Sequence, residues 1–433
     1  MINSIKKNFS AFLVFAFLFI NIIFNTVTVY AKEPAKTITN YKILNPYESV
    51  EWHDFNQYKA NFHTHTTESD GENSPKEMIE YYYRIGYDIL AITDHDFIST
   101  SWDRNDRNPD DYLTTERLNE INIGFGRNSR GMKNVPFANE QSMNINHLNT
   151  FWTKYNNSCD ATLKDNIANC EKTGGISHIN HPINDNANKY INLFLKYPSC
   201  VGIEMLNYRH GNMDSFINTW DTILSATMPE RPVWGFSNDD SHCLDEIGFN
   251  FNMMIMPENT EENIRFSMEN GTFYTVTLYV QNRHNKSPNA KGSFPTIKNI
   301  EVDSEMNSIT ITGENYHTIQ WIADNKVIST GQSINLNNHQ DKINNYVRAK
   351  LKGSHGLSYS QPFGIIEKSQ ILLGDINSDG IVDLSDYVLL IKHLSGINKY
   401  HLSGEKLLAA DVTNTGSLDL EDLEYMKNYL LDN

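Results

Sequence analysis

Six short apolar segments in the first two-thirds of the chain each run directly into polar side chains of the kind that surround metal ions. Uninterrupted apolar runs of this length, separated by helical patterns, are typical of buried parallel strands. The segments are 58–62, 89–92, 135–138, 175–179, 201–206 and 233–236, and the residues after them are His63 and His65, Asp94 and His95, Glu140, His181, Asn207, and Asp240 and His242. Because catalytic groups of an α/β barrel gather at the carboxyl ends of its strands, we expect these side chains to share one pocket. The pattern predicts a site for several metal ions.

Helical segments with recognisable ends separate these strands. Residues 74–77, Ser-Pro-Lys-Glu, have capping-box spacing with proline at the first helical position, and this helix should stop at Gly86. Further helices are expected over 162–173 and from Thr260 to 270. Alternation of strand and helix predicts an α/β domain over residues 32–285.

The N-terminus is typical of an export signal. Lys6 and Lys7 precede an apolar stretch, 11–24, that is too short to span a bilayer. Residues 29–31 fit a signal-peptidase site, so we expect residues 1–31 to be removed after Ala31. The mature protein is then expected to be secreted and to have no membrane span.

Export would allow the four cysteines to form disulfides. Cys159 and Cys170 are the favoured pair because they are close in the sequence, but the sequence leaves open the pairing of these two with Cys200 and Cys243. Cys243 follows His242 and is expected to be a buried thiol and not a metal ligand.

After a polar stretch at 282–291 the apolar periodicity changes to two. Ile309 and Ile311 alternate with threonines, and Ile319 and Trp321 alternate with polar residues. Residues 323–326 fit a hairpin turn. The pattern predicts a small antiparallel, immunoglobulin-like β-sandwich over residues 286–368, in which no ligand-type residues are grouped.

The last segment, 369–433, contains two copies of a calcium-loop pattern. In the first copy, oxygen side chains fall at loop positions 1, 3, 5, 9 and 12, and Gly380 is at position 6, where the chain must turn sharply. The second copy has threonines at positions 3 and 5, which are weaker ligands. The candidate calcium ligands are Asp375, Asn377, Asp379, Ile381 (through its carbonyl), Asp383, Asp386, Asp411, Thr413, Thr415, Ser417, Asp419 and Asp422.

This duplicated loop and helix, with aspartate at position 12, resembles a type I dockerin. The resemblance implies an all-α module that binds Ca²⁺ and docks onto a cohesin module of a scaffoldin or of a partner enzyme. The implied cohesin contacts are Leu384, Ser385, Leu420 and Glu421. An extracellular, cellulosome-like complex is the expected location.

The order of the ligand-type residues in the first domain resembles the PHP (polymerase and histidinol phosphatase) family of metallohydrolases. The Asn-His-Pro step at 180–182, the segment 203–207 and the following β-sandwich look most like its carbaryl-hydrolase-like branch. The resemblance implies a distorted (β/α)7 barrel with two or three divalent ions, zinc, manganese or iron, in its mouth. The implied ligands are His63, His65, Asp70, His95, Glu140, His147, His181, Asp240 and His242.

The resemblance also implies which of these residues bind each ion. His63, His65, Glu140 and Asp240 would hold one ion; Glu140 would bridge to a second ion on His147 and His181; and Asp70, His95 and His242 would hold a third. The implied catalytic residues are Glu140, Asp240 and His242. Arg209 and His210, just past the segment 201–206, are candidates for binding the substrate anion or protonating the leaving group, and a solvated rim is their structural alternative.

Several neighbouring residues have structural alternatives. Asp94 could orient an imidazole or hold a turn, and Asp239 is a rival of Asp240 as a ligand. His178 is expected to be structural or to support a ligand, and Trp102 and Trp220 are expected in the core.

These expectations favour a secreted metal-dependent hydrolase. Divalent ions lower the pKa of bound water, which supplies a hydroxide nucleophile near neutral pH. We expect phosphoester hydrolysis, on a small-molecule or glycan-linked ester. Carbamate, amide or ester hydrolysis on the same site remains an alternative, as does a non-catalytic cohesin-binding module, whereas no carboxylate pair is assignable to a glycosidase. The formal net charge of −17 argues against nucleic acid as a partner.

Overall fold

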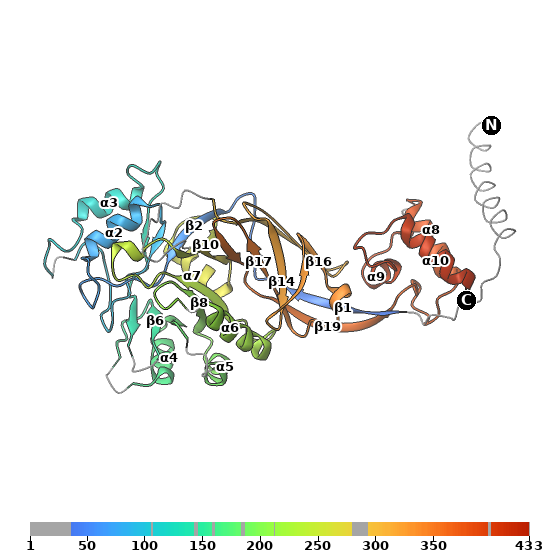
Figure 1. The fold of residues 1–433 in the computed structure, drawn as a ribbon, viewed down its shortest axis with the longest axis horizontal. Coiled ribbons are helices and arrows are strands. Elements are labelled where there is room, and N and C mark those ends of the chain that lie inside the picture. Colours follow the sequence, from blue (N-terminus) through green and yellow to red (C-terminus); the bar gives the residue numbers. More distant parts are fainter. Residues whose placement is uncertain are drawn as a thin grey trace. The chain divides into compact units, whose positions relative to one another are not determined.

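The computed structural model describes residues 36–104, 107–142, 146–157, 161–182, 187–211, 213–278, 293–396 and 400–432. The expected export signal and Cys159 lie outside these residues. The chain forms two compact units, one mainly over Ile38–Ile371 and the other mainly over Leu372–Asn433. Figure 1 shows the helices and strands of each unit.

The helices of the larger unit begin at the predicted caps. The side chain of Ser74 accepts a hydrogen bond from the backbone of Glu77, which completes the capping box, and the helix ends just before Gly86. Thr162 caps its helix in the same way, and the side chain of Thr260 accepts a hydrogen bond from the backbone of Asn263 without a capping box. The helices are α2 (Pro75–Arg84), α3 (Thr115–Ile123), α4 (Leu163–Lys172), α5 (Ala187–Lys196), α6 (Met213–Thr227) and α7 (Glu261–Asn270), with a 3-10 helix, η2, at Leu244–Glu246.

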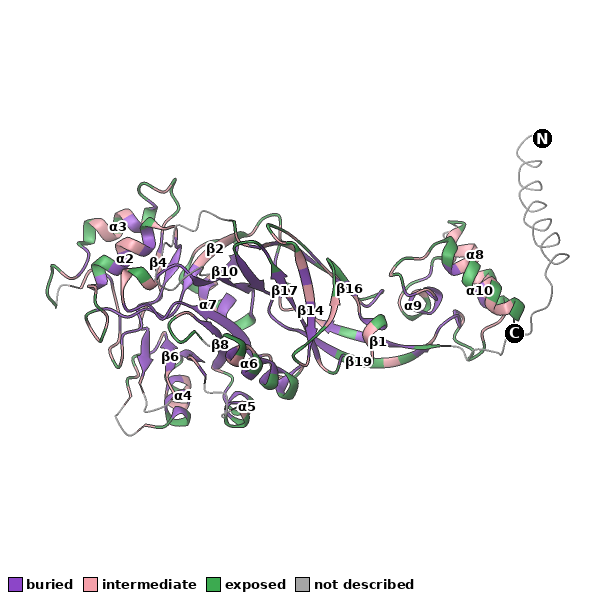
Figure 2. Ribbon diagram, viewed as in Figure 1, coloured by how far each residue is buried: buried purple, intermediate pink, exposed green. Residues whose placement is uncertain are grey.

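Five of the nine predicted ligands, Glu140, His147, His181, Asp240 and His242, lie in or next to the strands of a five-stranded sheet. Its order is β5 (Asn139–Gln141), β6 (Leu148–Phe151), β7 (Ile176–Ile179), β8 (Cys200–Asn207) and β9 (Trp234–Asn238). β7, β8 and β9 are parallel, whereas β6 runs antiparallel to both of its neighbours. Figure 1 shows α4, α5 and α6 along this sheet, and Figure 2 shows that β8 is buried throughout.

The other predicted ligands follow strands of a larger sheet. In it, β2 (Asn56–Asn61), β3 (Ile89–Leu90) and β4 (Lys133–Asn134) are parallel, and β10 (Asn250–Met256) pairs antiparallel with both β2 and β11 (Phe273–Leu278). The buried faces of these strands hold the central aromatic and aliphatic residues, among them Phe62, Met254 and Phe273.

The two sheets are open, in contrast to the closed (β/α)7 barrel expected from the resemblance. Among the described residues no continuous ladder joins them; two of the isolated bridges between them are Thr64 to Ser241 and His95 to Glu140. The short length of β3 and β4 and the reversed direction of β6 explain why a continuous parallel ladder does not form. Both bridges lie where strands end, so the carboxyl ends of β2, β3 and β9 and the strand β5 still converge.

The described residues of the predicted sandwich form antiparallel strands in two sheets, and one of these sheets is shared with the α/β part. β12 (Thr296–Asp303), β13 (Ser308–Glu314) and β16 (Ser333–Asn335) form one sheet, and β14 (Thr318–Ala323), β15 (Lys326–Thr330), β17 (Tyr346–Lys352), β18 (Gly356–Tyr359), β19 (Phe363–Leu372) and β1 (Thr37–Leu44) extend the larger one; η3 is at Leu336–His339. Asp324 and Asn325 have positive φ in the predicted β14–β15 turn. β18 pairs with β11, so hydrogen bonding continues across the predicted boundary near residue 285, which itself lies outside the described residues.

Two other expectations concern buried side chains. Trp102 and Trp220 are in the core, with exposures of 1% and 0%. Cys170 and Cys200 are buried, and no disulfide joins the cysteines in the part of the chain that the structure describes. The favoured pairing with Cys159 lies outside that part.

The smaller unit is helical, as predicted. Its helices are α8 (Leu384–Leu394), α9 (Glu405–Ala410) and α10 (Leu420–Asp432), and Leu390, Leu408 and Met426 are buried. None of the described helices in either unit combines the length and the apolar character that crossing a bilayer requires.

Candidate metal centre

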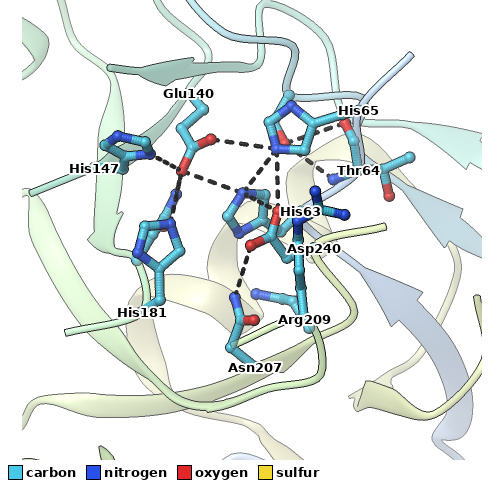
Figure 3. A network of polar contacts seen from close by, with 12 residues as sticks. His63, Thr64, His65, Glu140, His147, His181, Asn207, Arg209 and Asp240 are labelled. Atoms are coloured by element: carbon cyan, nitrogen blue, oxygen red, sulfur yellow. Dashed lines mark hydrogen bonds and ion pairs between the residues drawn. The ribbon is translucent and has the colours of Figure 1, made fainter. Parts of the chain in front are cut away.

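All nine predicted metal ligands gather where the strands of the two sheets end. They form four overlapping groups whose ligand atoms lie within 4.8 Å of one another: His65, Asp70, His95 and His242; His63, His181 and Asp240; His63, His65 and Glu140; and His95, Glu140 and His147. Figure 3 shows Glu140 between His147 and His181 on one side and His65 on the other. The assignment of each residue to a particular ion stays a prediction.

Glu140, on β5, is the centre of the cluster. Five imidazoles face its carboxylate: Oε1 is 3.2 Å from Nε2 of His63, 3.2 Å from Nδ1 of His147 and 3.3 Å from Nε2 of His181, and Oε2 is 3.2 Å from Nε2 of His65 and 3.0 Å from Nδ1 of His95. Oε2 is buried and makes no hydrogen bond of acceptable geometry. A buried carboxylate oxygen that is close to two imidazole nitrogens without a hydrogen bond is what an ion between these atoms would require.

Two of these imidazole nitrogens and one oxygen of Asp240 form a nearly equilateral triangle. Nε2 of His63 is 3.1 Å from Nε2 of His65, and each nitrogen is 3.2 Å from Oδ1 of Asp240. Edges of this length fit tetrahedral coordination with bonds of about 2.0 Å, which is the length of Zn–N and Zn–O bonds. The nitrogen and oxygen donors therefore fit a small divalent transition metal ion.

The group that contains Asp70, His95 and His242 is more open to solvent. Oδ1 of Asp70 is 3.2 Å from Nε2 of His242 and 3.7 Å from Nε2 of His95, and the Asp70 side chain is 56% exposed. On the other side of the His95 ring, Oγ of Ser142 is 2.6 Å from Nδ1. Sequence reasoning did not single out Ser142.

The carboxylates and imidazoles shift one another's pKa values. Burial on its own would lower the pKa of His65, but Asp240 and Glu140 outweigh it and raise that pKa to about 9. The pKa of His63 is raised well above its ordinary value against the same effect of burial. Burial opposes ionisation of Asp240 and Glu140, yet the neighbouring imidazoles hold both pKa values far below the usual range. The pocket therefore favours positive charge.

Asp94 holds a turn, and it reaches an imidazole only through Ser69, whose Oγ lies 3.4 Å from Nδ1 of His65. Its carboxylate accepts hydrogen bonds from N and Oγ1 of Thr66, at 2.6 and 2.7 Å, and from Oγ of Ser69 at 2.7 Å. These bonds fix the turn between His65 and Asp70, which are both predicted ligands.

Asp239 is excluded as a rival ligand by its hydrogen bonds. Its carboxylate accepts the backbone N–H groups of Gly248, Phe249 and Asn250 at 2.7 to 3.0 Å, and Nδ2 of Asn61 at 3.1 Å. It therefore stabilises the start of β10, and Asp240 is the residue that faces the histidines.

His178 is part of the core, as expected. Its ring is stacked on Phe236 at 4.7 Å and lies 5.4 Å from Phe151, and neither nitrogen has a hydrogen-bond partner. Burial lowers the pKa of His178 to about 4, so the ring is neutral at pH 7.

Arg209 and His210 lie on the rim of the cluster. Nη1 of Arg209 is 3.0 Å from Oε2 of Glu246, and 41% of the Arg209 side chain is exposed. The His210 ring lies 4.2 Å from the His181 ring, and its Nε2 is 3.5 Å from Oδ2 of Asp240. Both predicted rim residues are thus next to the ligands and open to solvent.

The sequence pattern placed Asn207 in the pocket but assigned no role to Glu204 or Asn180. Nδ2 of Asn180 donates to Oε1 of Glu140 at 2.6 Å, and Glu204 is a fully buried carboxylate in the middle of β8. A carboxylate inside an apolar strand needs buried donors, and this could have indicated the role of Glu204 from the sequence.

In the smaller unit, the first calcium loop is folded around its acidic residues. Oδ1 and Oδ2 of Asp375 accept the backbone N–H groups of Asp379 and Gly380, and the carboxylate of Asp386 accepts those of Asn377 and Asp383. Ile381 is exposed at position 7. The loop therefore brings positions 1, 3, 5 and 12 together as predicted.

The second loop repeats part of this arrangement. Asp422 accepts the backbone N–H groups of Thr413 and Asp419, and also the Thr413 hydroxyl at 2.7 Å. Asp411 is buried, and Thr415 and Ser417 are exposed. The Thr413 hydroxyl is therefore engaged with Asp422.

The four predicted cohesin contacts are on the surface. Leu384 and Leu420, the first residues of α8 and α10, are 67% and 73% exposed. Ser385 and Glu421 are exposed beside them. Two large apolar side chains exposed at equivalent positions of the repeat are suited to protein contact.

Comparison with known proteins identifies the smaller unit. Residues 373–431 match the family model of the dockerin type I domain, so this unit is a type I dockerin. No curated protein matches the chain.

Solved structures resemble this chain only distantly. A two-domain protein from Bacteroides vulgatus that contains a predicted PHP-like metal-dependent phosphoesterase is 14% identical over 79% of this chain and 92% of that one, with a TM-score of 0.40. A protein from Bifidobacterium adolescentis assigned as a metal-dependent phosphoesterase is 15% identical over 42% of this chain and 87% of that one (TM-score 0.29). An amidohydrolase from Chromobacterium violaceum, with bound sulfate and no metal, is 16% identical over the same shares, 42% and 87% (TM-score 0.28). At these TM-scores, the chemistry of the site must be inferred from its own geometry.

Proposed function

We propose that the protein is a PHP-type metal-dependent hydrolase that acts on phosphoesters and is attached through its dockerin to a cohesin module. The observation that carries the proposal is the Glu140 carboxylate, which faces five imidazoles within 3.3 Å. A carboxylate surrounded in this way can bridge two cations. When bound, two or three divalent ions of zinc, manganese or iron would polarise the substrate and acidify water in the pocket.

The residues of the chain have separable roles in this proposal. The nine ligands bind the ions, with Glu140, Asp240 and His242 next to the reacting atoms. Arg209, held by Glu246, would bind the anionic group of the substrate, because a guanidinium is suited to phosphate oxygens. His210, whose Nε2 is 3.5 Å from Oδ2 of Asp240, would give a proton to the leaving oxygen.

Phosphoesters are favoured because of the charges at the rim. A phosphate would bring negative charge to face the bound cations and the Arg209 guanidinium on the rim. A carbamate, amide or carboxylic ester lacks this charge and would leave Arg209 without a partner in the substrate. We therefore place these substrates second.

The dockerin suggests the cellular context. By the properties of type I dockerins, calcium would order the two loops, and Leu384, Ser385, Leu420 and Glu421 would contact a cohesin of a scaffoldin or of another enzyme. With removal of residues 1–31, the protein would act outside the cell.

The decisive experiment combines metal analysis with hydrolysis assays. The full-length mature protein should bind two or three transition metal ions per chain and hydrolyse a generic phosphomonoester or phosphodiester. Glu140→Ala should lose at least one ion and about three orders of magnitude in kcat. Glu258→Ala, at an exposed carboxylate outside the cluster, is the matched control.

Two results would contradict the proposal. Full metal loading with no hydrolysis of either phosphate substrate would reject phosphoester chemistry, and activity in a parallel panel of aryl esters and carbamates would then favour the alternative. A wild-type protein that binds no transition metal would reject the hydrolase altogether and leave a dockerin-borne module without catalysis.

A further inference from the structure

Glu204 is linked by hydrogen bonds to three of the predicted metal ligands, which are His63, His181 and, through Asn207, Asp240. Its side chain is fully buried in β8. Oε1 is 2.8 Å from Nδ1 of His63 and accepts Nδ2 of Asn238 at 2.9 Å, and Oε2 accepts the backbone N–H of His181 and Nδ2 of Asn207, both at 2.8 Å. A carboxylate has about four lone-pair positions, and all of them are used here.

The first connection determines which nitrogen of His63 binds a metal. The Glu204 carboxylate accepts hydrogen bonds only, so Nδ1 of His63 must carry the proton. Nε2 is then left unprotonated in the neutral ring, and this is the nitrogen that lies 3.2 Å from both Glu140 and Asp240.

The second connection fixes the backbone of His181. This residue has a φ of +24°, which non-glycine residues seldom adopt. Its N–H donates to Oε2 of Glu204, and its Nε2 reaches Oε1 of Glu140 at 3.3 Å. The hydrogen bond therefore helps to hold an unfavourable backbone conformation that turns the ring toward the cluster.

The third connection passes through Asn207. Its Nδ2 donates to Oε2 of Glu204 at 2.8 Å and to Oδ2 of Asp240 at 3.2 Å. Because Oδ2 is engaged, Asp240 directs Oδ1 toward the two histidines. Oδ1 of Asn207 also accepts the N–H of His210 at 3.0 Å, which ties the rim to the same network.

We propose that Glu204 is a positioning residue for the metal centre, which sets the tautomer of His63, the backbone of His181 and, through Asn207, the orientation of Asp240. The proposal rests on the metal binding put forward under the proposed function. Partners of this kind orient metal ligands, and their loss typically weakens metal binding 10–100-fold.

The test is Glu204→Gln, which keeps the size of the side chain but presents an amide N–H₂ to donors that need an acceptor. We expect the affinity for Zn²⁺, measured on the full-length protein by competition with a chromophoric chelator, to fall about 10–100-fold. The visible spectrum of the Co²⁺-loaded protein should change, because it reports the number and geometry of the ligands. Glu204→Asp should retain more affinity than Glu204→Gln.

Asp221→Asn is the matched control for a purely structural role. Asp221 is also fully buried and also accepts several side-chain donors, from Arg348 and Tyr346, but it contacts none of the metal ligands. It should lower the melting temperature and leave Zn²⁺ affinity and the Co²⁺ spectrum unchanged. If Glu204→Gln does not fold, Asn207→Ala should change the same spectrum while leaving Glu204 in place.

Each outcome is decisive. Wild-type affinity and an unchanged Co²⁺ spectrum in Glu204→Gln, or in Asn207→Ala if that variant is needed, would overturn the proposal. An equal loss of affinity in Asp221→Asn would also overturn it. A wild-type protein without metal binding would instead refute the proposed function, and this inference with it.

Discussion

The backbones of His95 and Glu140 pair in an isolated parallel bridge, and their side chains also meet, with Nδ1 of His95 3.0 Å from Oε2 of Glu140. His95 follows β3 of one sheet, whereas Glu140 lies in β5 of the other. The bridge therefore brings donors from two separate sheets to one point. Metal binding at this point should stabilise the contact between the sheets.

Metal loading should release protons. The pKa of His63 is well above its ordinary value and that of His65 is about 9, so these two rings, whose Nε2 atoms are 3.1 Å apart, share at least one extra proton at pH 7 before an ion binds. Because metal ions bind neutral imidazole, loading with Zn²⁺ should release at least one proton per chain. Titration calorimetry in buffers of different ionisation enthalpy measures this number. Binding that is independent of the buffer would contradict the prediction.

Replacing His178 should reduce the loss of unfolding free energy that occurs at acid pH. The pKa of His178 falls from 6.5 to about 4 on burial, so the unfolded chain binds a proton at a higher pH than the folded protein does. This residue leaves stability unaffected above pH 6.5 and reduces it as the pH falls from 6.5 to 4, by about 3 kcal/mol in total.

In His178→Leu this loss should disappear, and the variant should keep the metal content of the wild type. Denaturant unfolding of the metal-free proteins between pH 4.5 and 7.5 gives both curves. Parallel curves for the variant and the wild type would show that burial of the neutral ring has no such effect.

Breaking the ion pair of Asp221 should destabilise the whole larger unit. Asp221 on α6 accepts Nε and Nη2 of Arg348 on β17 at 2.7 and 2.6 Å, and both side chains are buried. Asp221→Ala leaves a buried guanidinium without its partner, which should cost about 3–5 kcal/mol. Calorimetry should show one lowered transition, and Asp221→Leu combined with Arg348→Met should recover most of the loss. Separate transitions for the α/β part and the sandwich would contradict the shared core.

Removing the rim guanidinium should affect substrate binding more than turnover. Arg209→Ala should raise KM for a phosphoester about tenfold, because a hydrogen bond to a charged group is worth about 1.5–3 kcal/mol, and should leave the bound metal unchanged. Glu246→Gln, which weakens the hold on Arg209, should have a smaller effect in the same direction. Steady-state kinetics with metal analysis separates these effects, and an unchanged KM would argue against an anion-binding role.

The two dockerin loops should differ in calcium affinity. The first loop has Asn377 and Asp379 at positions 3 and 5, whereas the second has threonines, so the second should bind Ca²⁺ at least about tenfold more weakly. Excess chelator should unfold this unit and abolish cohesin binding, and added Ca²⁺ should restore both. Asp386→Ala should abolish the tighter site. Cohesin binding that persists in chelator would contradict the prediction.

Much of the site could be predicted because its residues follow short-range patterns. Seven of the nine predicted ligands follow apolar runs, and the Ser74–Glu77 capping box and the Asp324–Asn325 turn are determined by a few adjacent residues. Glu204 was missed because its role depends on donors from four separate places in the chain. The open sheets were also missed, since strand length and direction depend on long-range pairing that periodicity does not report.

The pairing of β18 with β11 limits how this protein can be divided. Leu357 pairs with Thr277 and Tyr359 with Thr275, so one strand of the sandwich completes the edge of the sheet that leads to the metal cluster. A recombination or an expression boundary placed near residue 285 would leave β11 with bare amide and carbonyl groups, which invite pairing with other chains. The α/β part and the sandwich should therefore be kept together whenever the protein is truncated or recombined with another.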